Sequence, residues 1–593
     1  NVDRMKKFKK IVSVVLGLLL TLNVVGCTQE ETKTTTKVKD FDAYIEKLPT
    51  LLMADDDMNL EFTFENPSNY GFEEELLNLP YSDEDDYKES KKECEKILKE
   101  LKSFDYDKLS DSQKLTYDIL VDYLQRNAYQ YDYYYLDNSY LGSFISFQAQ
   151  LPLLLSEFTF ERQNDLDSYF HILETAEETF LKYAEVEKKR QENNSGLAKN
   201  ILDKTIEQCQ NYTNGSDDYL IERINQRIDQ VEFLNDEEKA AAKQKNQELV
   251  SVNLENAYTS LGEELKTITA TNQENKGLYF SSNGKEYYEA MLQGRVGTDM
   301  TVDEVKEYLQ NKQIELIMEA RTLLTDNPEL QNVTGFSDLV YSDFTSVEET
   351  LDYLKTVIFQ DYPEIDNLNY EIITVPDAWK DNFSPAAYLQ GKIDASIDTP
   401  ELIYINGDYS QTLFDTIEHE GYPGHMYQHT YFKQQKNIPT VRYLIDYNGY
   451  SEGWATYVEW NGYKYAPVED KTLLEYKSLN DRLTAVFICL MDIGIHYDGW
   501  DYDDYVDYWK NNFGEVSEDT MLEQYNLFIE TPTNYLQYYL SGFLFQDLYN
   551  KAEEELGEKF SSVDFHDVIL STGPSSFNIL EKQVDSFISE KSK

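Results

Sequence analysis

The sequence predicts a mostly α-helical protein that carries only a small β-sheet. Between residues 41 and 270 the chain has few breaks, and Asp111 to Gln125 carries apolar side chains at helical spacing. Asp217 to Val250 is long, highly charged and free of glycine and proline, which also favours helix. Strand-forming residues concentrate in two short runs, 369–375 and 401–406, so any sheet must be small.

The N-terminal residues 1–26 are predicted to be a lipoprotein signal peptide. A basic segment, Lys6 to Lys10, precedes an apolar segment, Ile11 to Val25, that is shorter than a membrane span. It ends in Val-Val-Gly-Cys27, which resembles a bacterial lipobox. We therefore expect cleavage before Cys27, lipidation of its sulfur and attachment to the outer face of the bacterial cytoplasmic membrane. A plain secretory signal with a chance cysteine is the alternative.

Four segments are expected along the chain. After the signal peptide, residues 27–40 are polar and form a tether that starts with the lipidated cysteine. A polar stretch with Gly and Asn, 272–284, marks a boundary between an N-terminal helical region, 41–272, and a catalytic helical region, 273–593. Within the first region, Met58 to Asn66 alternates between apolar and polar residues and predicts a short strand.

Helices resume after the boundary. Thr301-Val-Asp-Glu304 and Ser346-Val-Glu-Glu349 have the capping-box pattern that begins a helix. Leu473 to Gly494 and Thr520 to Leu548 predict further helices in the same half of the chain.

Composition excludes several classes of protein. A net charge of −57 excludes a nucleic-acid-binding surface, and it disfavours adsorption to anionic lipid without an acyl anchor. The charge could favour cationic peptides near a cleft, or it could serve solubility alone. Beyond the lipobox, the three cysteines Cys94, Cys209 and Cys489 cannot all pair and have no metal-site spacing, so no disulfide framework is expected.

The chemistry is concentrated in Glu418-His-Glu-Gly-Tyr-Pro-Gly-His425, which contains two of the six histidines of the chain. Two neutral imidazoles, His419 and His425, can bind zinc, and Glu420 can take a proton from a metal-bound water. The usual zinc-peptidase helix spaces its histidines four residues apart, about 40° off alignment. Here they are six apart and would diverge by roughly 120° on a continuous helix.

A break between the two histidines would let them converge. Pro423 disfavours helix at Tyr422, and Gly424 permits a positive φ. We therefore expect a helix that ends near Gly421, a tight turn and a new helix near His425. The alternative is a helix end with two incidental histidines.

A third ligand is sought in Tyr450-Ser-Glu-Gly-Trp-Ala-Thr-Tyr-Val-Glu459. Glu452 resembles the ligand glutamate of the Glu-Gly-Phe-Ala type in gluzincin aminopeptidases. Glu459 lies seven residues later on the same helix face, so it is either the competing ligand or an acceptor for a histidine N–H. A solvated helix glutamate is the alternative for Glu452.

Five blocks in the same order resemble the bacterial domain-of-unknown-function family 885, a set of zinc-peptidase-like proteins. The resemblance is dense from about residue 280, but Met426 stands where the family often has a second histidine. The matching residues are His419 to His425 with Gln428; Glu452 to Ala455 with Tyr457 and Glu459; Asp492, Gly494 and His496 with Gly499, Trp500 and the preceding Arg482; Tyr539 and Gly542; and Phe565, His566, Asp567, Leu570 and Gly573.

This resemblance implies a large multi-helix, gluzincin-like peptidase fold with the small sheet beside the active-site cleft. It implies one Zn²⁺ per chain, held by His419, His425 and Glu452, and hydrolysis of oligopeptides with Glu420 as general base. In gluzincin-like enzymes an edge strand at the position of residues 401–406 binds substrate by strand addition. A plain packing strand is the alternative here.

Four further residues have expected roles. Tyr539, then His496 and His566, are the candidate donors to the oxyanion, because tyrosine and histidine do this in related zinc peptidases. Arg482 could bind a substrate carboxylate, or it could form an ion pair within the fold. The alternative for the tyrosine and the histidines is structural, as packed or helix-capping residues.

Tyr457 is the second predicted substrate-binding residue, beside Arg482. The expected partners are an oligopeptide and, through Cys27, a membrane. Two other functions remain open: a lipid-anchored peptide- or solute-binding protein that has lost the chemistry, and a zinc hydrolase of a non-peptide amide or ester. The presence of all four residues of the metal-and-base set counts against the first.

Overall fold

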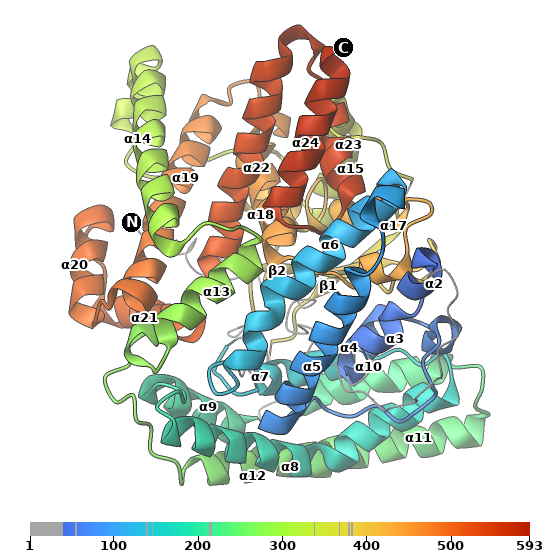
Figure 1. The fold of residues 1–593 in the computed structure, drawn as a ribbon. Helices are drawn as coiled ribbons and strands as arrows, with labels where there is room; N and C mark the ends of the chain where they lie inside the picture. The colour runs from blue at the N-terminus through green and yellow to red at the C-terminus, as the bar shows by residue number, and fades with distance from the viewer. Residues whose placement is uncertain are drawn as a thin grey trace.

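The fold is described from a computed structural model (Figure 1). It describes residues 40–53, 56–137, 140–144, 146–212, 216–336, 339–366, 368–377, 380 and 383–593. The expected signal peptide, the lipidation site Cys27 and nearly all of the tether lie outside these residues. The prediction of a mostly α-helical protein is confirmed, and the small sheet is present.

The helices of the first half form a layer at the base of Figure 1 and a pair, α5 and α6, that rises from it. The bounds are α2 (Phe41–Ile45), α3 (Leu48–Leu52), α4 (Asp57–Thr63), α5 (Glu84–Leu101), α6 (Asp111–Asn127), α7 (Phe147–Ser156), α8 (Gln163–Glu192), α9 (Lys199–Asn211), α10 (Ser216–Gln230), α11 (Asp236–Glu248) and α12 (Glu255–Leu265).

The predicted strand over Met58 to Asn66 is wrong, because α4 covers most of it. Met58, Leu60 and Phe64 are buried, and Phe62 packs edge-on against Phe158. The alternating residues 58, 60, 62 and 64 form two pairs at i, i+4 spacing. A short helix buried on two sides therefore produces the same pattern as a strand.

The helices of the second half stand above the basal layer (Figure 1). Their bounds are α13 (Gly284–Val296), α14 (Val302–Asp326), α15 (Val347–Val357), α16 (Phe414–Glu420), α17 (His425–Lys433), α18 (Asn448–Gly462), α19 (Thr472–Ile493), α20 (Tyr502–Phe513), α21 (Glu518–Glu530), α22 (Asn534–Leu556), α23 (Ser562–Thr572) and α24 (Phe577–Ser592). The predicted caps are confirmed, since Thr301 and Ser346 accept from the N–H groups of Glu304 and Glu349 at 3.2 and 3.0 Å.

The sheet has three strands, β1 (Tyr370–Thr374), β2 (Ala386–Leu389) and β3 (Glu401–Ile405), in the order β1-β3-β2. β1 pairs parallel to β3 and β2 pairs antiparallel to it. The expected edge strand at 401–406 is therefore wrong, because β3 is bonded on both sides. The edge strand that reaches α16 is β2.

Two hydrophobic cores hold these layers together. One joins α7 to α12 and Met58 of α4 with Val375, Ala387 and Tyr404 of the sheet region, and the other joins the remaining helices apart from α4. The second core includes residues of α2, α3, α5 and α6, which precede the first core in sequence. The two cores therefore do not divide at residue 272, the expected boundary.

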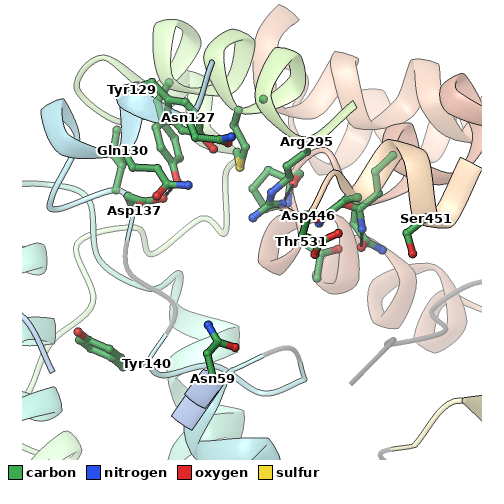
Figure 2. Close-up of a pocket in the computed structure, with 18 of the residues that line it drawn as sticks. Asn59, Asn127, Tyr129, Gln130, Asp137, Tyr140, Arg295, Asp446, Ser451 and Thr531 are labelled. Atoms are coloured by element: carbon green, nitrogen blue, oxygen red, sulfur yellow. Dashed lines mark hydrogen bonds between the residues drawn. The ribbon is translucent and has the colours of Figure 1, made fainter. Parts of the chain in front are cut away.

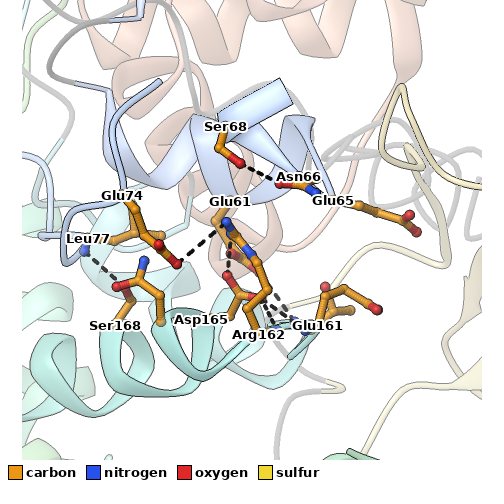
Figure 3. Close-up of polar contacts among 12 residues, drawn as sticks. Glu61, Glu65, Asn66, Ser68, Glu74, Leu77, Glu161, Arg162, Asp165 and Ser168 are labelled. Atoms are coloured by element: carbon orange, nitrogen blue, oxygen red, sulfur yellow. Dashed lines mark hydrogen bonds and ion pairs between the residues drawn. The ribbon is translucent and has the colours of Figure 1, made fainter. Parts of the chain in front are cut away.

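Polar contacts attach the segment between α4 and α5 to the basal layer (Figure 3). Arg162, at the start of α8, pairs with Asp165 at 2.7 Å and lies 3.9 Å from Glu74. The N–H of Leu77 donates to Oγ of Ser168 at 3.1 Å. These contacts hold the segment against α8.

The described cysteines, Cys94, Cys209 and Cys489, are free and buried, so the expectation of a fold without a disulfide framework is confirmed for this part of the chain. Across the described residues, we find no helix with the length and apolar character that a bilayer crossing requires.

Candidate metal centre

The turn between the two histidines has the predicted form. α16 ends at Glu420 and α17 begins at His425. The N–H of Gly424 donates to the carbonyl oxygen of Glu418 at 2.9 Å, and Nε1 of Trp454 donates to the carbonyl of Pro423, also at 2.9 Å. The break turns the second helix back, so that two histidines six residues apart converge.

Gly424 serves a different purpose from the one expected. Its φ is −80°, so no positive φ is involved. A Cβ at this position would lie 1.8 Å from the carbonyl oxygen of His419 and 2.4 Å from that of Glu418. Glycine is required because two backbone segments approach each other closely.

Helix α18 brings Glu452 to the same point. Its Gly453 packs directly on α22, where a Cβ would lie 2.3 Å from Cβ of Ser541. This contact lets the two helices approach closely, and it leaves Glu452 fully buried. The Glu-Gly pair thus combines a ligand with the glycine that allows the helix to reach the site.

His419, His425 and Glu452 form one buried cluster, in which one ligand atom of each lies within 4.8 Å of the others. Oε2 of Glu452 lies 3.3 Å from Nε2 of His425 and 3.8 Å from Nε2 of His419. Two ligands of a tetrahedral zinc ion lie about 3.3 Å apart, given metal–ligand distances of about 2.0–2.1 Å.

The polar atoms of the cluster also fit a metal ion. Both Nε2 atoms and both oxygens of Glu452 are buried without a hydrogen-bond partner among the described residues. Buried polar atoms are normally paired, so four that point at one another are exceptional. The donor set, two imidazoles and one carboxylate, is one that catalytic zinc uses.

Glu459 contacts one histidine of the cluster and lies outside the group of three residues that could hold a metal ion. Its Oε2 lies 3.0 Å from Nδ1 of His419, so Nδ1–H donates to the carboxylate and Nε2 faces the cluster. Of the two roles that the sequence left open, this geometry selects the hydrogen-bond acceptor. A carboxylate in this position fixes the histidine tautomer and raises its basicity.

The electrostatics of the cluster favour a cation. Burial lowers the pKa of His419, but the adjacent Glu452 and Glu459, with Glu420, more than reverse this and raise it to about 10. Without a metal, the imidazole of His419 is therefore protonated on both nitrogens, as a cation, at neutral pH. A metal ion that enters the cluster would displace one of these protons.

Glu420 is placed beside the cluster with one oxygen free. Its Oε2 accepts the backbone N–H of Tyr388 on β2 at 2.8 Å, whereas Oε1 is buried and has no hydrogen-bond partner in the described structure. The edge strand thus orients the carboxylate that the sequence predicted as the base. Tyr388 could not be found from sequence, because the contact spans 32 residues.

The tyrosine at the cluster is Tyr538, and the predicted Tyr539 is displaced from it. The ring of Tyr538 stacks on His419 with centroids 6.3 Å apart, and burial, then Glu452 and Glu420, raise its pKa. The ring of Tyr539 stacks on Trp460 instead. Adjacent helix residues point about 100° apart, so only one of the two can face the cluster.

His496 lies outside the cluster and holds backbone segments together. Its Nδ1 accepts from the N–H of Leu278 at 3.1 Å, and Nε2–H donates to the carbonyl of Phe528 at 2.7 Å. Burial lowers its pKa to about 4, so the ring stays neutral. Both nitrogens are used, and the structural alternative describes this histidine.

His566 and Tyr457 are bonded to each other. Nδ1–H of His566 donates to the carbonyl of Asp361 at 2.7 Å, and its Nε2 accepts from the hydroxyl of Tyr457 at 2.9 Å. Burial lowers the pKa of His566 to about 4. These bonds occupy the groups that were expected to meet an oxyanion or a substrate.

Arg482 forms the ion pair that was its alternative role. Its Nη2 lies 3.0 Å from Oε1 of Glu319, which joins α19 to α14. It does not line the cavity described next.

A cavity of about 430 Å³ opens onto the cluster. His425 and Tyr538 of the cluster region line it, and so do Arg295, Asp446 and Thr531, which Figure 2 shows. Its volume falls in the range of small-molecule and peptide sites. The arrangement therefore combines a candidate metal-binding cluster, a buried carboxylate with a free oxygen and an adjoining cavity.

The protein thus has a mostly helical fold, with a buried cluster of two histidines and one carboxylate at a cavity. The chain belongs to the family described as "Bacterial protein of unknown function (DUF885)", which matches residues 68–584. A search of curated proteins found no significant match.

Two solved structures share the fold. One is a candidate lipoprotein from Colwellia psychrerythraea, with a TM-score of 0.78 and 16% identity, over 93% of this chain and 99% of that one. The other is a candidate lipoprotein of unknown function from Shewanella oneidensis, with a TM-score of 0.61 and 14% identity, over 92% of this chain and 99% of that one.

Replacement of Glu459 by Gln is expected to weaken zinc binding about 10- to 100-fold, because the amide no longer raises the basicity of His419. Competition with a chromophoric chelator measures this affinity. Tyr539→Phe is the matched control, since its hydroxyl has no hydrogen-bond partner in the described part of the chain. An equal loss of zinc affinity in both variants would contradict the role of Glu459.

Proposed function

We propose that this protein is a zinc-dependent hydrolase that cleaves peptide bonds of oligopeptides, with a gluzincin-like arrangement of its site. The observation that supports it most is the buried cluster of His419, His425 and Glu452, whose facing atoms have no partner within the described protein. A binding protein without chemistry would have no need for such a cluster beside a free carboxylate oxygen on Glu420.

Each residue of the site has a role in this proposal. His419, His425 and Glu452 would hold one Zn²⁺. The bound ion would lower the pKa of a coordinated water to about 7 and polarise a carbonyl. Oε1 of Glu420 takes the proton of the attacking water and returns it to the leaving amine. The hydroxyl of Tyr538 donates to the oxyanion that develops on the substrate.

The edge strand supports a peptide as substrate. In a β-strand, the N–H and the C=O of one residue point to the same side. Because the N–H of Tyr388 reaches Glu420, its carbonyl also faces the site and can accept from the backbone of an extended peptide. This role replaces the one that the sequence assigned to residues 401–406.

We infer that the protein acts outside the cytoplasm as a lipid-anchored enzyme. The lipobox-like Val-Val-Gly-Cys27 supports this location, and both structural neighbours are candidate lipoproteins. A lipid at Cys27 would place the enzyme on the outer face of the cytoplasmic membrane, within reach of peptides in the surroundings.

Metal analysis of the chain from residue 28 onward, with peptidase assays before and after chelation, tests the proposal. We expect one zinc per chain in the wild type, loss of zinc and activity in Glu452→Gln, and recovery of the chelated wild type when zinc is added. Stoichiometric zinc without peptidase activity would redirect the search to other amides and esters. A folded wild type that binds no zinc would refute the mechanism.

A further inference from the structure

Arg295 is an unpaired cation in the cavity. Three arginine or lysine side chains line the described cavity, and two of them have carboxylate partners: Arg190 pairs with Glu187 at 2.9 Å and Lys276 pairs with Glu274. No carboxylate of the described residues lies within ion-pair distance of Arg295. Burial raises the pKa of Asp137 and of Asp492, and the charge of Arg295 partly offsets this, but neither carboxylate forms an ion pair with it. In a chain with a net charge of −57, a cation at a cavity wall without an ion-pair partner among the described residues requires an explanation.

The guanidinium of Arg295 is fixed in place from one side. Its Nη1 donates to the carbonyl of Pro532 at 3.0 Å and to Oγ1 of Thr533 at 3.2 Å. No hydrogen bond is found for Nε and Nη2 among the described residues. Neither atom is among the buried polar atoms without a partner, so both are accessible from the cavity or from solvent. One side of the fork is thus held by protein, and the other is available to a ligand.

The block around Asp492, which the sequence analysis singled out, supports this corner. Oδ2 of Asp492 accepts from the hydroxyl of Tyr288 at 2.6 Å and from the N–H of Thr533 at 2.9 Å. Tyr288 lies on α13, two turns before Arg295, and Thr533 has a left-handed φ of 65°. Asp492 therefore couples the helix that carries Arg295 to the residue that holds its guanidinium.

Helix α22 connects this corner to the metal centre. Thr533 precedes its first turn and Tyr538, which faces the cluster, follows five residues later, about 7.5 Å along the axis. An extended peptide advances about 3.4 Å per residue. Measured along α22 alone, this rise corresponds to about two residues of an extended peptide, so we expect a short fragment between a carboxylate at Arg295 and a carbonyl at the cluster.

We propose, resting on the proposed peptidase function, that Arg295 binds the free C-terminal carboxylate of the substrate, so that the enzyme releases short C-terminal fragments. Arginine presents two parallel N–H donors that match a carboxylate, which is why it recognises chain ends so well. In Figure 2, Arg295 lies between the group around Asp137 and the group around Asp446 and Thr531, within the pocket. Of the pocket's acidic residues, Asp137 is already bonded to the hydroxyl of Tyr287 at 2.9 Å.

The test compares one oligopeptide as free acid and as C-terminal amide. In the wild type we expect kcat/KM for the acid to exceed that for the amide by about 100-fold, the effect of a charged hydrogen-bonded pair. In Arg295→Gln the two values should become equal, with zinc content unchanged. Arg295→Lys, which keeps the charge, should recover part of the difference. Mass spectrometry should detect C-terminal products of two or three residues.

Asp446→Asn is the second variant, since Asp446 also lines the cavity and no hydrogen bond joins it to a described residue; burial, then the charge of Glu452, raises its pKa to about 7. It should keep the preference for the acid. Equal rates for acid and amide in the wild type would overturn the proposal. The proposal would also be overturned if only Asp446→Asn lost the preference for the acid, which would indicate recognition of the amino terminus.

Failure of the proposed function would be visible separately. If neither peptide is cleaved, calorimetry measures the binding of the same acid and amide to the wild type and to Arg295→Gln. A preference for the acid that disappears in the variant supports the carboxylate site without any hydrolysis. Equal affinities in the wild type refute it.

Discussion

Glu420→Gln should lower kcat/KM for peptide hydrolysis by about 10²- to 10⁴-fold, the usual contribution of a general base, while zinc content stays at one per chain. Glutamine keeps the oxygen that accepts the N–H of Tyr388, so the edge strand remains in place. It cannot take a proton at the position of Oε1. Single-turnover kinetics with metal analysis of the same sample measure both quantities.

A neighbouring glutamate supplies the control. Glu418 is buried, and burial, followed by Asp415 and Glu459, raises its pKa well above the ordinary value. No hydrogen bond to either carboxyl oxygen is found among the described residues, and glutamine keeps the size of the side chain, so Glu418→Gln should leave the rate close to that of the wild type. A similar fall in both variants would mean that Glu420 acts through the fold and not as a base.

Gly424→Ala should abolish stoichiometric zinc binding and, with it, peptidase activity. The added methyl group would lie 1.8 Å from the carbonyl oxygen of His419, and backbone atoms cannot yield as a flexible side chain can. The turn must open, which moves His425 away from His419. We also expect the free energy of unfolding to fall by about 2 kcal/mol or more, the typical cost of overpacking.

Zinc analysis and denaturant titration of the purified variant measure these effects. Gly335→Ala is the control, because a Cβ there meets nothing within 4 Å and the backbone φ is not positive. It should keep its zinc and its stability. A Gly424→Ala protein that holds zinc as tightly as the wild type would show that the histidines do not depend on this turn.

The local chemistry of the site was accessible from the sequence. His419 and His425 could be predicted to converge because proline and glycine between them must interrupt a helix, and α16 and α17 do end and begin there. Glu452 was identified with them through the family resemblance, and the three residues lie within 4.8 Å of one another. The helical class followed from periodicity, and the caps at Thr301 and Ser346 from two short patterns.

Two of the errors share one cause, since each depends on packing or pairing between segments that are distant in the chain. Tyr539 was preferred to Tyr538, but the rotation of α22 about its axis depends on its packing against α18. The strand at 401–406 was placed at the sheet edge, but strand order is decided by pairing between distant segments. For the same reason β2, at residues 386–389, could not be identified as the strand that holds Glu420.

The sequence by itself therefore predicted the helical class and the turn that brings the two histidines together, because these depend on residues close in the chain. The family resemblance added Glu452 to the candidate cluster. Only the tertiary structure decided that Glu459 contacts His419, that Tyr538 faces the cluster and that Arg295 lines the cavity without an ion-pair partner among the described residues. Those facts depend on contacts between helices far apart in sequence. Such contacts are set by side-chain packing, and no local pattern of residues encodes that packing.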